Sequence, residues 1–178
     1  TLAKYGLCRD EFAASGHWSP QLYVREGRRM RGALLMTQRD ILSDGAKADS
    51  IAVASFPIDS HDCRRIARGG NEVINEGTIF PARDPATKRG PAYQVPYRAI
   101  TPKAAECSNL LVPVALSATH VAYSSIRVEP AWMTIGHSAG VAAALAAKEN
   151  AGVQKLDYAK LRERLLAQKQ VIDLPSKP

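Results

Sequence analysis

Hydrophobic and polar positions divide the chain into two parts of different character. In residues 17–100, short apolar stretches alternate with glycine, proline and charged residues, which is typical of strands separated by turns. Pro96 favours an edge position for the last of these strands. The pattern predicts an irregular, mostly antiparallel β region with strands at residues 21–24, 33–38, 49–57, 72–80 and 94–100.

A different pattern begins after residue 100. Residues 109–116, NLLVPVAL, form an almost continuous apolar run, which predicts a strand buried on both faces, as in a parallel sheet. A polar loop over residues 117–129 is expected next. A long helix then begins near Pro130, which suits the N1 position, and Gly152 is expected to stop it. Alanine dominates residues 130–147, with polar residues among them, so a buried, close-packed helix is favoured over a membrane span.

One more helix is predicted at the end of the chain. It runs from Asp157, a good N-cap residue, to Lys169. Its apolar positions Leu161, Leu165 and Leu166 are expected to form one buried face. Strands followed by helices predict an α/β or α+β arrangement.

Composition and charge narrow the classes of partner. The chain has 178 residues, 46% of them hydrophobic, which is enough for a sizeable core, and its net charge of +7 favours anionic partners. Few aromatic residues accompany the basic ones and no nucleic-acid module is recognisable, so nucleic acid is not expected as a partner. Cys8, Cys63 and Cys107 are far apart, so neither a metal site nor a disulfide framework is expected.

The sequence GHSAG at residues 136–140 matches the G-x-S-x-G pattern of a serine-hydrolase elbow, with Ser138 as the nucleophile. The elbow requires a strand before the serine and a histidine after it in the chain. No histidine follows His137. We therefore interpret the glycines and alanines here as the small face of a closely packed helix, and keep a serine hydrolase as an alternative function. A non-catalytic basic binding module is a further alternative.

Three stretches together resemble one family. They are GHWSPQLYVREGRRMRG at residues 16–32, SFPIDSHD at 55–62, and the long stretch from PYRAITPK to AGVAAALA at 96–146. In this order they resemble the FAD-dependent oxidoreductases of the glutathione-reductase-like flavoprotein superfamily, some of whose members are named xanthan lyases. The resemblance implies that the intact protein transfers a hydride between a substrate and FAD. It also implies a β-rich substrate-domain portion over residues 1–100 and the closing part of an FAD-binding domain over 101–178.

The resemblance also implies which residues lie near the flavin. A helix N-terminus facing the flavin pyrimidine ring would stabilise the negative charge of the reduced ring. The helix that begins near Pro130 is the one expected to do so. The residues implied to contact the cofactor, mostly through their backbone, are Ser117, Ala118, Ser125, Ile126, Arg127 and Pro130.

Three further residues are candidates for catalysis. His120 is a candidate proton donor near the flavin, with a hydrogen-bonded structural role as the alternative. Arg25 and Arg29 share a face if residues 25–29 are extended, and both suit an anionic substrate. The alternatives for these arginines are a solvated face and internal ion pairs with Glu26. Arg127 equally suits an anion or a pairing with a carboxylate such as Glu129.

The glycine-rich turn that holds the FAD pyrophosphate in this superfamily, G-x-G-x-x-G, does not occur in the sequence. We therefore expect a C-terminal fragment that binds FAD weakly or not at all by itself, with an exposed sheet edge that favours homo-oligomers. The first residue is Thr1 and not methionine, so an N-terminal address cannot be read and no compartment is assigned.

Overall fold

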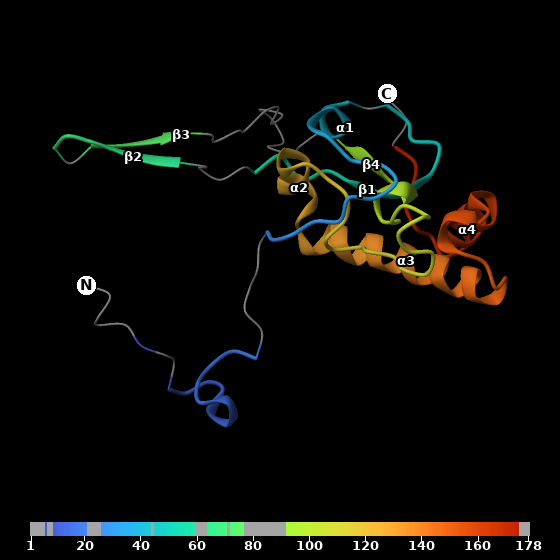
Figure 1. Ribbon diagram of the computed structural model, residues 1–178, viewed down its shortest axis with the longest axis horizontal. Helices are drawn as coiled ribbons and strands as arrows, with labels where there is room; N and C mark the ends of the chain where they lie inside the picture. Colours follow the sequence, from blue (N-terminus) through green and yellow to red (C-terminus); the bar gives the residue numbers. More distant parts are fainter. Residues whose placement is uncertain are drawn as a thin grey trace.

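The fold is built around a short antiparallel strand pair covered by helices (Figure 1). The computed structural model describes residues 6, 9–20, 26–43, 45–59, 64–70, 72–76 and 92–174. The longer elements, in chain order, are α1 (Gln38–Leu42), β1 (Ser50–Ala54), β2 (Arg64–Arg68), β3 (Glu72–Glu76), β4 (Tyr93–Pro96), α2 (His120–Ile126), α3 (Glu129–Lys148) and α4 (Tyr158–Ala167). Short 3-10 turns are η2 (Ala13–Ser15), η3 (Tyr97–Ala99) and η4 (Val153–Lys155). The chain is therefore an α+β protein, as the sequence predicted.

The central sheet consists of β1 and β4, which pair antiparallel with a bulge between Ser50 and Ala52. All of β4 and the first three residues of β1 are buried, and Ile51, Tyr93 and Val95 have no exposed surface. Two strands alone bury too little to be stable in water. Their stability therefore depends on the helices that cover them.

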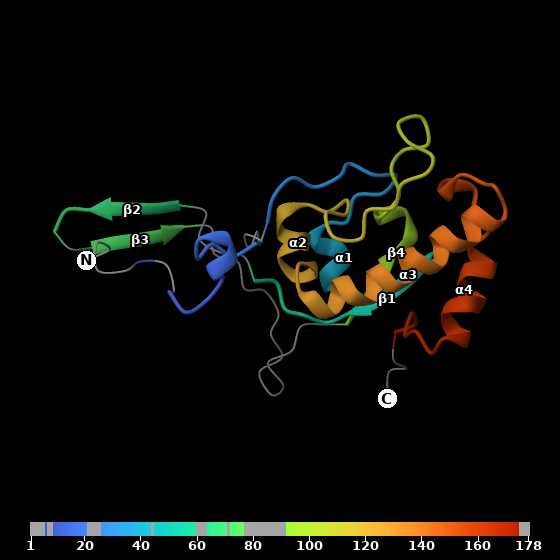
Figure 2. The same cartoon turned by 90° about the horizontal axis from the view of Figure 1, so that it is seen from below.

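Helix α3 supplies most of that cover. It packs on β1, and α4 packs in turn against α3, while α1 lies against β4 and α2 (Figure 2). Alanines dominate the α3 surface that meets the sheet, with Ala139 and Ala142 buried beside Ile135. Small side chains allow the helix and the strand to approach closely. One hydrophobic core results, and it runs from Met36 to Ile172.

Side chains also donate hydrogen bonds to backbone carbonyls of β1 on the edge that faces away from β4. Ser138 Oγ donates to the Ile51 carbonyl at 2.6 Å, and Tyr158 Oη donates to the Ser50 carbonyl at 2.6 Å. Gln170 Nε2 reaches the Ile51 carbonyl as well, at 3.2 Å. A buried backbone carbonyl without a partner would cost about 1–3 kcal/mol. This edge is thus hydrogen-bonded by side chains in place of a third strand. The side chains come from α3, α4 and the segment after α4.

The second strand pair, β2–β3, lies apart from the core (Figure 1). Its ten residues are exposed except Ile66 and Ile74, which are partly buried and face each other across the pair. Arg64 is opposite Glu76, and Arg68 is opposite Glu72. Opposite charges at facing positions favour this pairing.

Several sequence predictions are confirmed. Residues 49–57 contain β1, and 72–76 form β3, while residues 21–24 and 77–80 lie outside the described residues. The long helix begins one residue before Pro130. The Asp157 carboxylate caps α4 by accepting from the Ala159 N–H at 2.9 Å.

Two predicted strands are wrong. In residues 33–38, Met36 forms only an isolated parallel bridge with Ala118, and a helix begins at Gln38. The helix starts there because the Asp40 carboxylate accepts from both the N–H and the hydroxyl of Thr37. Residues 109–116 form no strand, and their side chains are not buried on both faces, since Leu110 and Val114 are nearly half exposed. Pro113 and the lack of a neighbouring strand in the described structure explain the irregular path.

The predicted limits of other elements also change. Residues 117–129 are not a loop throughout, because Thr119 caps α2 by accepting from the Ala122 N–H. Helix α3 ends at Lys148, before the expected stop at Gly152, and Asn150 takes the left-handed conformation. The strand predicted at 94–100 ends at Pro96, where a 3-10 turn follows. Leu161 and Leu165 of α4 are buried as expected.

Leu166 is a smaller exception on α4. Its side chain is 42% exposed, so the buried face of the helix is narrower than the sequence predicted.

Candidate functional site

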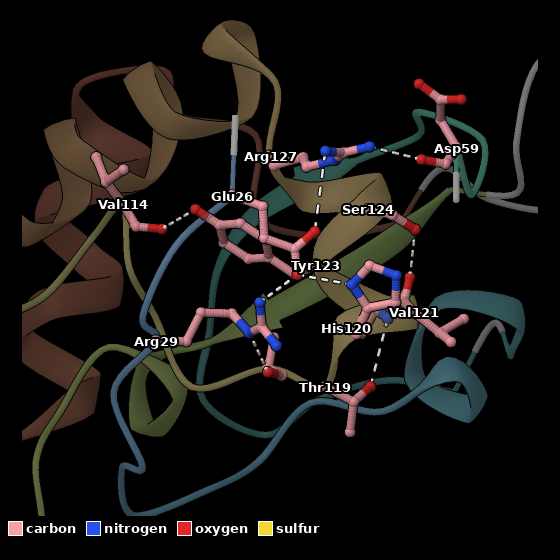
Figure 3. Close-up of polar contacts among 12 residues, drawn as sticks. Glu26, Arg29, Asp59, Val114, Thr119, His120, Val121, Tyr123, Ser124 and Arg127 are labelled. Carbon is pink, nitrogen blue, oxygen red and sulfur yellow. Dashed lines mark hydrogen bonds and ion pairs between the residues drawn. The ribbon is translucent and has the colours of Figure 1, made fainter. Parts of the chain in front are cut away.

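Three basic side chains from two segments of the chain converge on one carboxylate (Figure 3). Glu26 Oε1 lies 2.7 Å from His120 Nδ1 and also accepts from the Arg29 guanidinium. Glu26 Oε2 lies 3.9 Å from Arg127 Nη1. We call Glu26, Arg29, His120 and Arg127 the Glu26 cluster.

Helix α2 and the residues at its two ends position the cluster. His120 is the first residue of α2, and Arg127 follows its last residue, two residues before α3. The start of α2 is fixed by Thr119, whose N–H donates to the Met36 carbonyl at 2.8 Å. Glu26 and Arg29 come from the extended segment that passes beside α2.

Each arginine has a second contact that holds its guanidinium in place. Arg29 Nε donates to the Ala118 carbonyl at 2.9 Å, and its guanidinium lies 5.2 Å from the centre of the Tyr123 ring. Arg127 Nη2 donates to the Asp59 carbonyl at 2.7 Å, and the Asp59 carboxylate points away from it in Figure 3. A cation over an aromatic face is stabilised by the ring's electrons. The positive groups are therefore fixed before any ligand arrives.

The ring of Tyr123 lies against the guanidinium of Arg29. Its hydroxyl donates to the Val114 carbonyl at 3.1 Å. Burial raises the pKa of this phenol, and the nearby charges of Arg29 and Arg127 oppose that rise. Tyr123 thus stays neutral near physiological pH and acts as an apolar and stacking partner.

The charges in the cluster do not cancel. Two guanidinium groups face one carboxylate, so the cluster carries a positive charge even when His120 is neutral. The His120 side chain is 46% exposed, whereas that of Arg127 is only 6% exposed. An anionic group would reach His120 first and would feel the charge of the arginines behind it.

The predicted flavin contacts separate into interior and accessible positions. Ser117, Ser125 and Ile126 have no exposed surface, and Ala118 is 4% exposed. Ser125 Oγ donates to the Phe56 carbonyl and accepts from Tyr93 Oη. The backbone of Ser117 is also engaged, with its N–H on the Ala99 carbonyl and its carbonyl accepting from the Met36 N–H.

Ser117 retains one unused group, since its buried hydroxyl has no hydrogen-bond partner in the described part of the chain. Pro130, in contrast, is exposed in the first turn of α3. Val128 precedes that turn and has no side-chain atom that could cap it. The exposed start of α3 thus fits an anionic ring system better than the interior residues do, and the buried Arg127 adds positive charge behind it. The cofactor roles of all six residues stay predictions.

The arginine-rich segment contributes Arg29 but not in the expected geometry. Arg25 lies outside the described residues, and residues 26–32 form no strand. Arg29 pairs internally with Glu26, which is one of the alternatives that the sequence left open. Arg127 likewise pairs with Glu26 and not with Glu129.

The GHSAG sequence lies in the middle of α3, with no strand before it. Ser138 is fully buried, donates to the Ile51 carbonyl and accepts from Gln170 Nε2 at 3.1 Å. A nucleophile must be exposed at a sharp turn, next to a base. The serine-hydrolase alternative is therefore not favoured.

GHSAG is helical, as interpreted, but the prediction that its small residues form a closely packed face is wrong for most of them. Ala139 is buried, whereas Gly140 and Ala143 are exposed and a Cβ added at Gly136 or Gly140 would meet nothing within 4 Å.

Sequence reasoning missed two parts of this site. Glu26 was considered only as an ion-pair partner of the arginines, although it is the one carboxylate inside that basic segment. Tyr123 follows His120 by three residues, which is the spacing of neighbours on a helix. That signal was invisible because the segment was interpreted as a loop.

The described residues contain neither a metal-binding cluster nor a membrane-spanning helix. In those ranges, no three His, Cys, Asp or Glu side chains are arranged to hold a metal ion. None of the helices described there is both long and apolar enough to cross a membrane.

Comparison with known proteins assigns the chain to a family. No curated protein and no solved structure matches it. A sequence profile described as FAD dependent oxidoreductase does match, over residues 2–165. The match covers the Glu26 cluster, the core strands and the whole of α3. The chain therefore belongs to the FAD dependent oxidoreductase family.

Proposed function

We propose that the protein transfers a hydride between FAD and a small-molecule or anionic substrate, and that the Glu26 cluster faces the reacting groups. The observation that carries this is the convergence of two guanidinium groups and an imidazole on Glu26, with Arg127 two residues before the long helix α3. Positive groups that are fixed in advance stabilise negative charge that develops in a reaction. FAD, when bound, supplies the acceptor or donor of the two electrons.

The residues of the chain have separate parts in this proposal. Arg127 and the first turn of α3, with Pro130, hold negative charge on the flavin side. Arg29 attracts an anionic group of the substrate. When the substrate is oxidised, it loses a hydride and a proton, and His120 accepts the proton at Nε2. His120 returns a proton in the reverse direction.

The division of the chain and its assembly are parts of the same proposal. Residues 1–100 would contribute to a substrate domain and residues 101–178 to the flavin domain. The core of the chain contains residues from both ranges, so the two portions pack directly on each other. The pyrophosphate of FAD would be held by a glycine-rich turn that this sequence does not contain. An exposed strand edge would allow self-association.

Flavin content tests the proposal. Purified protein that contains this chain together with a glycine-rich G-x-G-x-x-G turn is expected to show flavin absorbance. In that protein, Arg127→Met is expected to weaken FAD binding about 10-fold, or about 1.4 kcal/mol, through loss of one charge-assisted contact. Arg39→Met is the matched control, because Arg39 is an exposed arginine on α1, away from the cluster. A colourless protein that takes up no added FAD would contradict the proposal. Equal weakening by both substitutions would also contradict it.

A further inference from the structure

We propose that Glu26 is a positioning residue for His120: its carboxylate holds the imidazole in the form protonated at Nδ1, which leaves Nε2 free to exchange protons. The inference deepens the proposed function, since it names the atom of His120 that acts. It concerns the state of the ring, which can be measured without a substrate or a flavin.

The contact between the two side chains carries the inference. His120 Nδ1 lies 2.7 Å from Glu26 Oε1. An ionised carboxylate only accepts hydrogen bonds, so the ring must carry its proton at Nδ1 to make this contact. The bond that one ring nitrogen makes decides which nitrogen of a neutral histidine is protonated. Without such a bond, neutral imidazole in water prefers the proton at Nε2.

The surroundings hold the Glu26 carboxylate in place against His120. The Arg29 guanidinium donates to the same oxygen, Oε1, and cannot lose its proton. Arg29 Nε also donates to the carbonyl of Ala118, two residues before His120 in the chain. The arginine thus ties the carboxylate to the start of α2. The Glu26 side chain is only 19% exposed, so water competes little for its oxygens.

The other nitrogen of His120, Nε2, is available to exchange a proton. No hydrogen bond of Nε2 is found within the described part of the chain, and the side chain is 46% exposed. An acid, a histidine oriented by it and an accessible ring nitrogen form the arrangement that general acid–base catalysis uses.

Nitrogen-15 NMR of the histidine rings, in the protein carrying this full chain, tests the inference. At a pH where His120 is neutral, its ring is expected to show the Nδ1–H pattern, with assignment by loss of the signals in His120→Gln. Glu26→Gln retains a side-chain oxygen acceptor and is expected to keep that pattern. Glu26→Ala removes the acceptor and is expected to shift His120 to the Nε2–H pattern.

Two other histidines serve as internal controls. His17 Nδ1 lies 2.9 Å from the Glu11 carbonyl, and His137 is exposed on α3, so neither is expected to change in the Glu26 variants. An Nε2–H pattern for His120 in the unchanged protein would overturn the inference, whether or not Glu26→Ala folds. An unchanged Nδ1–H pattern in a folded Glu26→Ala protein would overturn it too. Loss of flavin binding leaves this readout unaffected, so failure of the proposed function is seen separately.

Discussion

The two strand pairs, β1–β4 and β2–β3, have the same antiparallel topology and opposite surroundings. The first is buried on both faces, and side chains from α3, α4 and the segment after α4 bond to its free edge. The second exposes nearly all its residues, and its strands contact only each other to any extent. The contribution of a strand pair to the free energy of unfolding therefore depends on its burial and not on the pairing alone.

The difference arises from what lies around the strands. In β1, the Ile51 side chain is buried in the core, and the Ile51 carbonyl accepts a hydrogen bond from Ser138. In β3, Ile74 meets mainly Ile66 across the pair, and the residues two positions away on each side, Glu72 and Glu76, are charged. We expect the global stability to depend on the first pair, and the second to open independently. The following predictions test that contrast, from the largest effect to the smallest.

Truncation of one isoleucine in each pair gives the strongest contrast. Ile51→Ala is expected to lower the free energy of unfolding by about 3 kcal/mol, because it leaves a cavity in the hydrophobic core. Ile74→Ala is the matched control and is expected to cost less than about 1 kcal/mol, because its side chain is only partly buried. Urea unfolding followed by circular dichroism measures both values. Similar losses would show that the pairs do not differ as proposed.

Removal of the Ser138 hydroxyl tests the bonded edge of β1. Ser138→Ala is expected to cost about 1–2 kcal/mol, because a buried hydrogen bond to the Ile51 carbonyl is lost. Thr134→Ala removes a hydroxyl one turn earlier, which bonds only to the Pro130 carbonyl of its own helix, and should cost less than about 0.5 kcal/mol. A fluorophosphonate probe that labels Ser138 in the folded protein would instead revive the hydrolase alternative.

Alkaline pH is expected to weaken the β4 region. Burial raises the pKa of Tyr97 to about 12, from an ordinary value of 10.0, and burial also raises the pKa of Tyr93. The folded state thus favours the neutral phenols. Their contribution to stability is complete below pH 10.0 and is lost as the pH rises towards the raised pKa of about 12.

Tyr97→Phe is the variant for this test. It loses the hydrogen bond to the Val153 carbonyl, worth about 1 kcal/mol, but its urea midpoint should fall less steeply above pH 10.0 than that of the unchanged protein. Parallel curves for the two proteins would rule out a role for Tyr97. The strands β2 and β3 contain no tyrosine, so local opening of that pair should not follow this titration.

The smallest effect is expected at the turn of the exposed pair. Gly70 has φ +82°, where a side chain is strained although nothing lies within 4 Å of the added Cβ. Gly70→Ala should therefore cost about 1 kcal/mol within β2–β3. Hydrogen exchange should speed up for amides of β2 and β3 and stay unchanged for β1 and β4. A lower global unfolding midpoint would mean that the hairpin is coupled to the core.

Local signals identified the elements that depend on local chemistry. Asp157 and Pro130 marked two helix starts because capping and a missing N–H act within one turn. The strand predicted from the apolar run at 109–116 was wrong. A buried strand also needs a neighbouring strand, which no local pattern reveals. Helix α2 was missed because Thr119 and His120 resemble loop residues as readily as a helix start.

Of the candidate site, Arg29, His120 and Arg127 were identified individually from the sequence or its resemblance. Their meeting at Glu26 was not, because it joins residues 94 positions apart in the chain. The sequence by itself determined the family, the positive charge and the long alanine-rich helix, since these follow from residue types and short-range spacing. Only the tertiary structure decided that Ser138 is a core residue, that β2–β3 is exposed, and that one carboxylate orders three basic groups. Those outcomes depend on long-range packing, which sets burial and brings distant charges together.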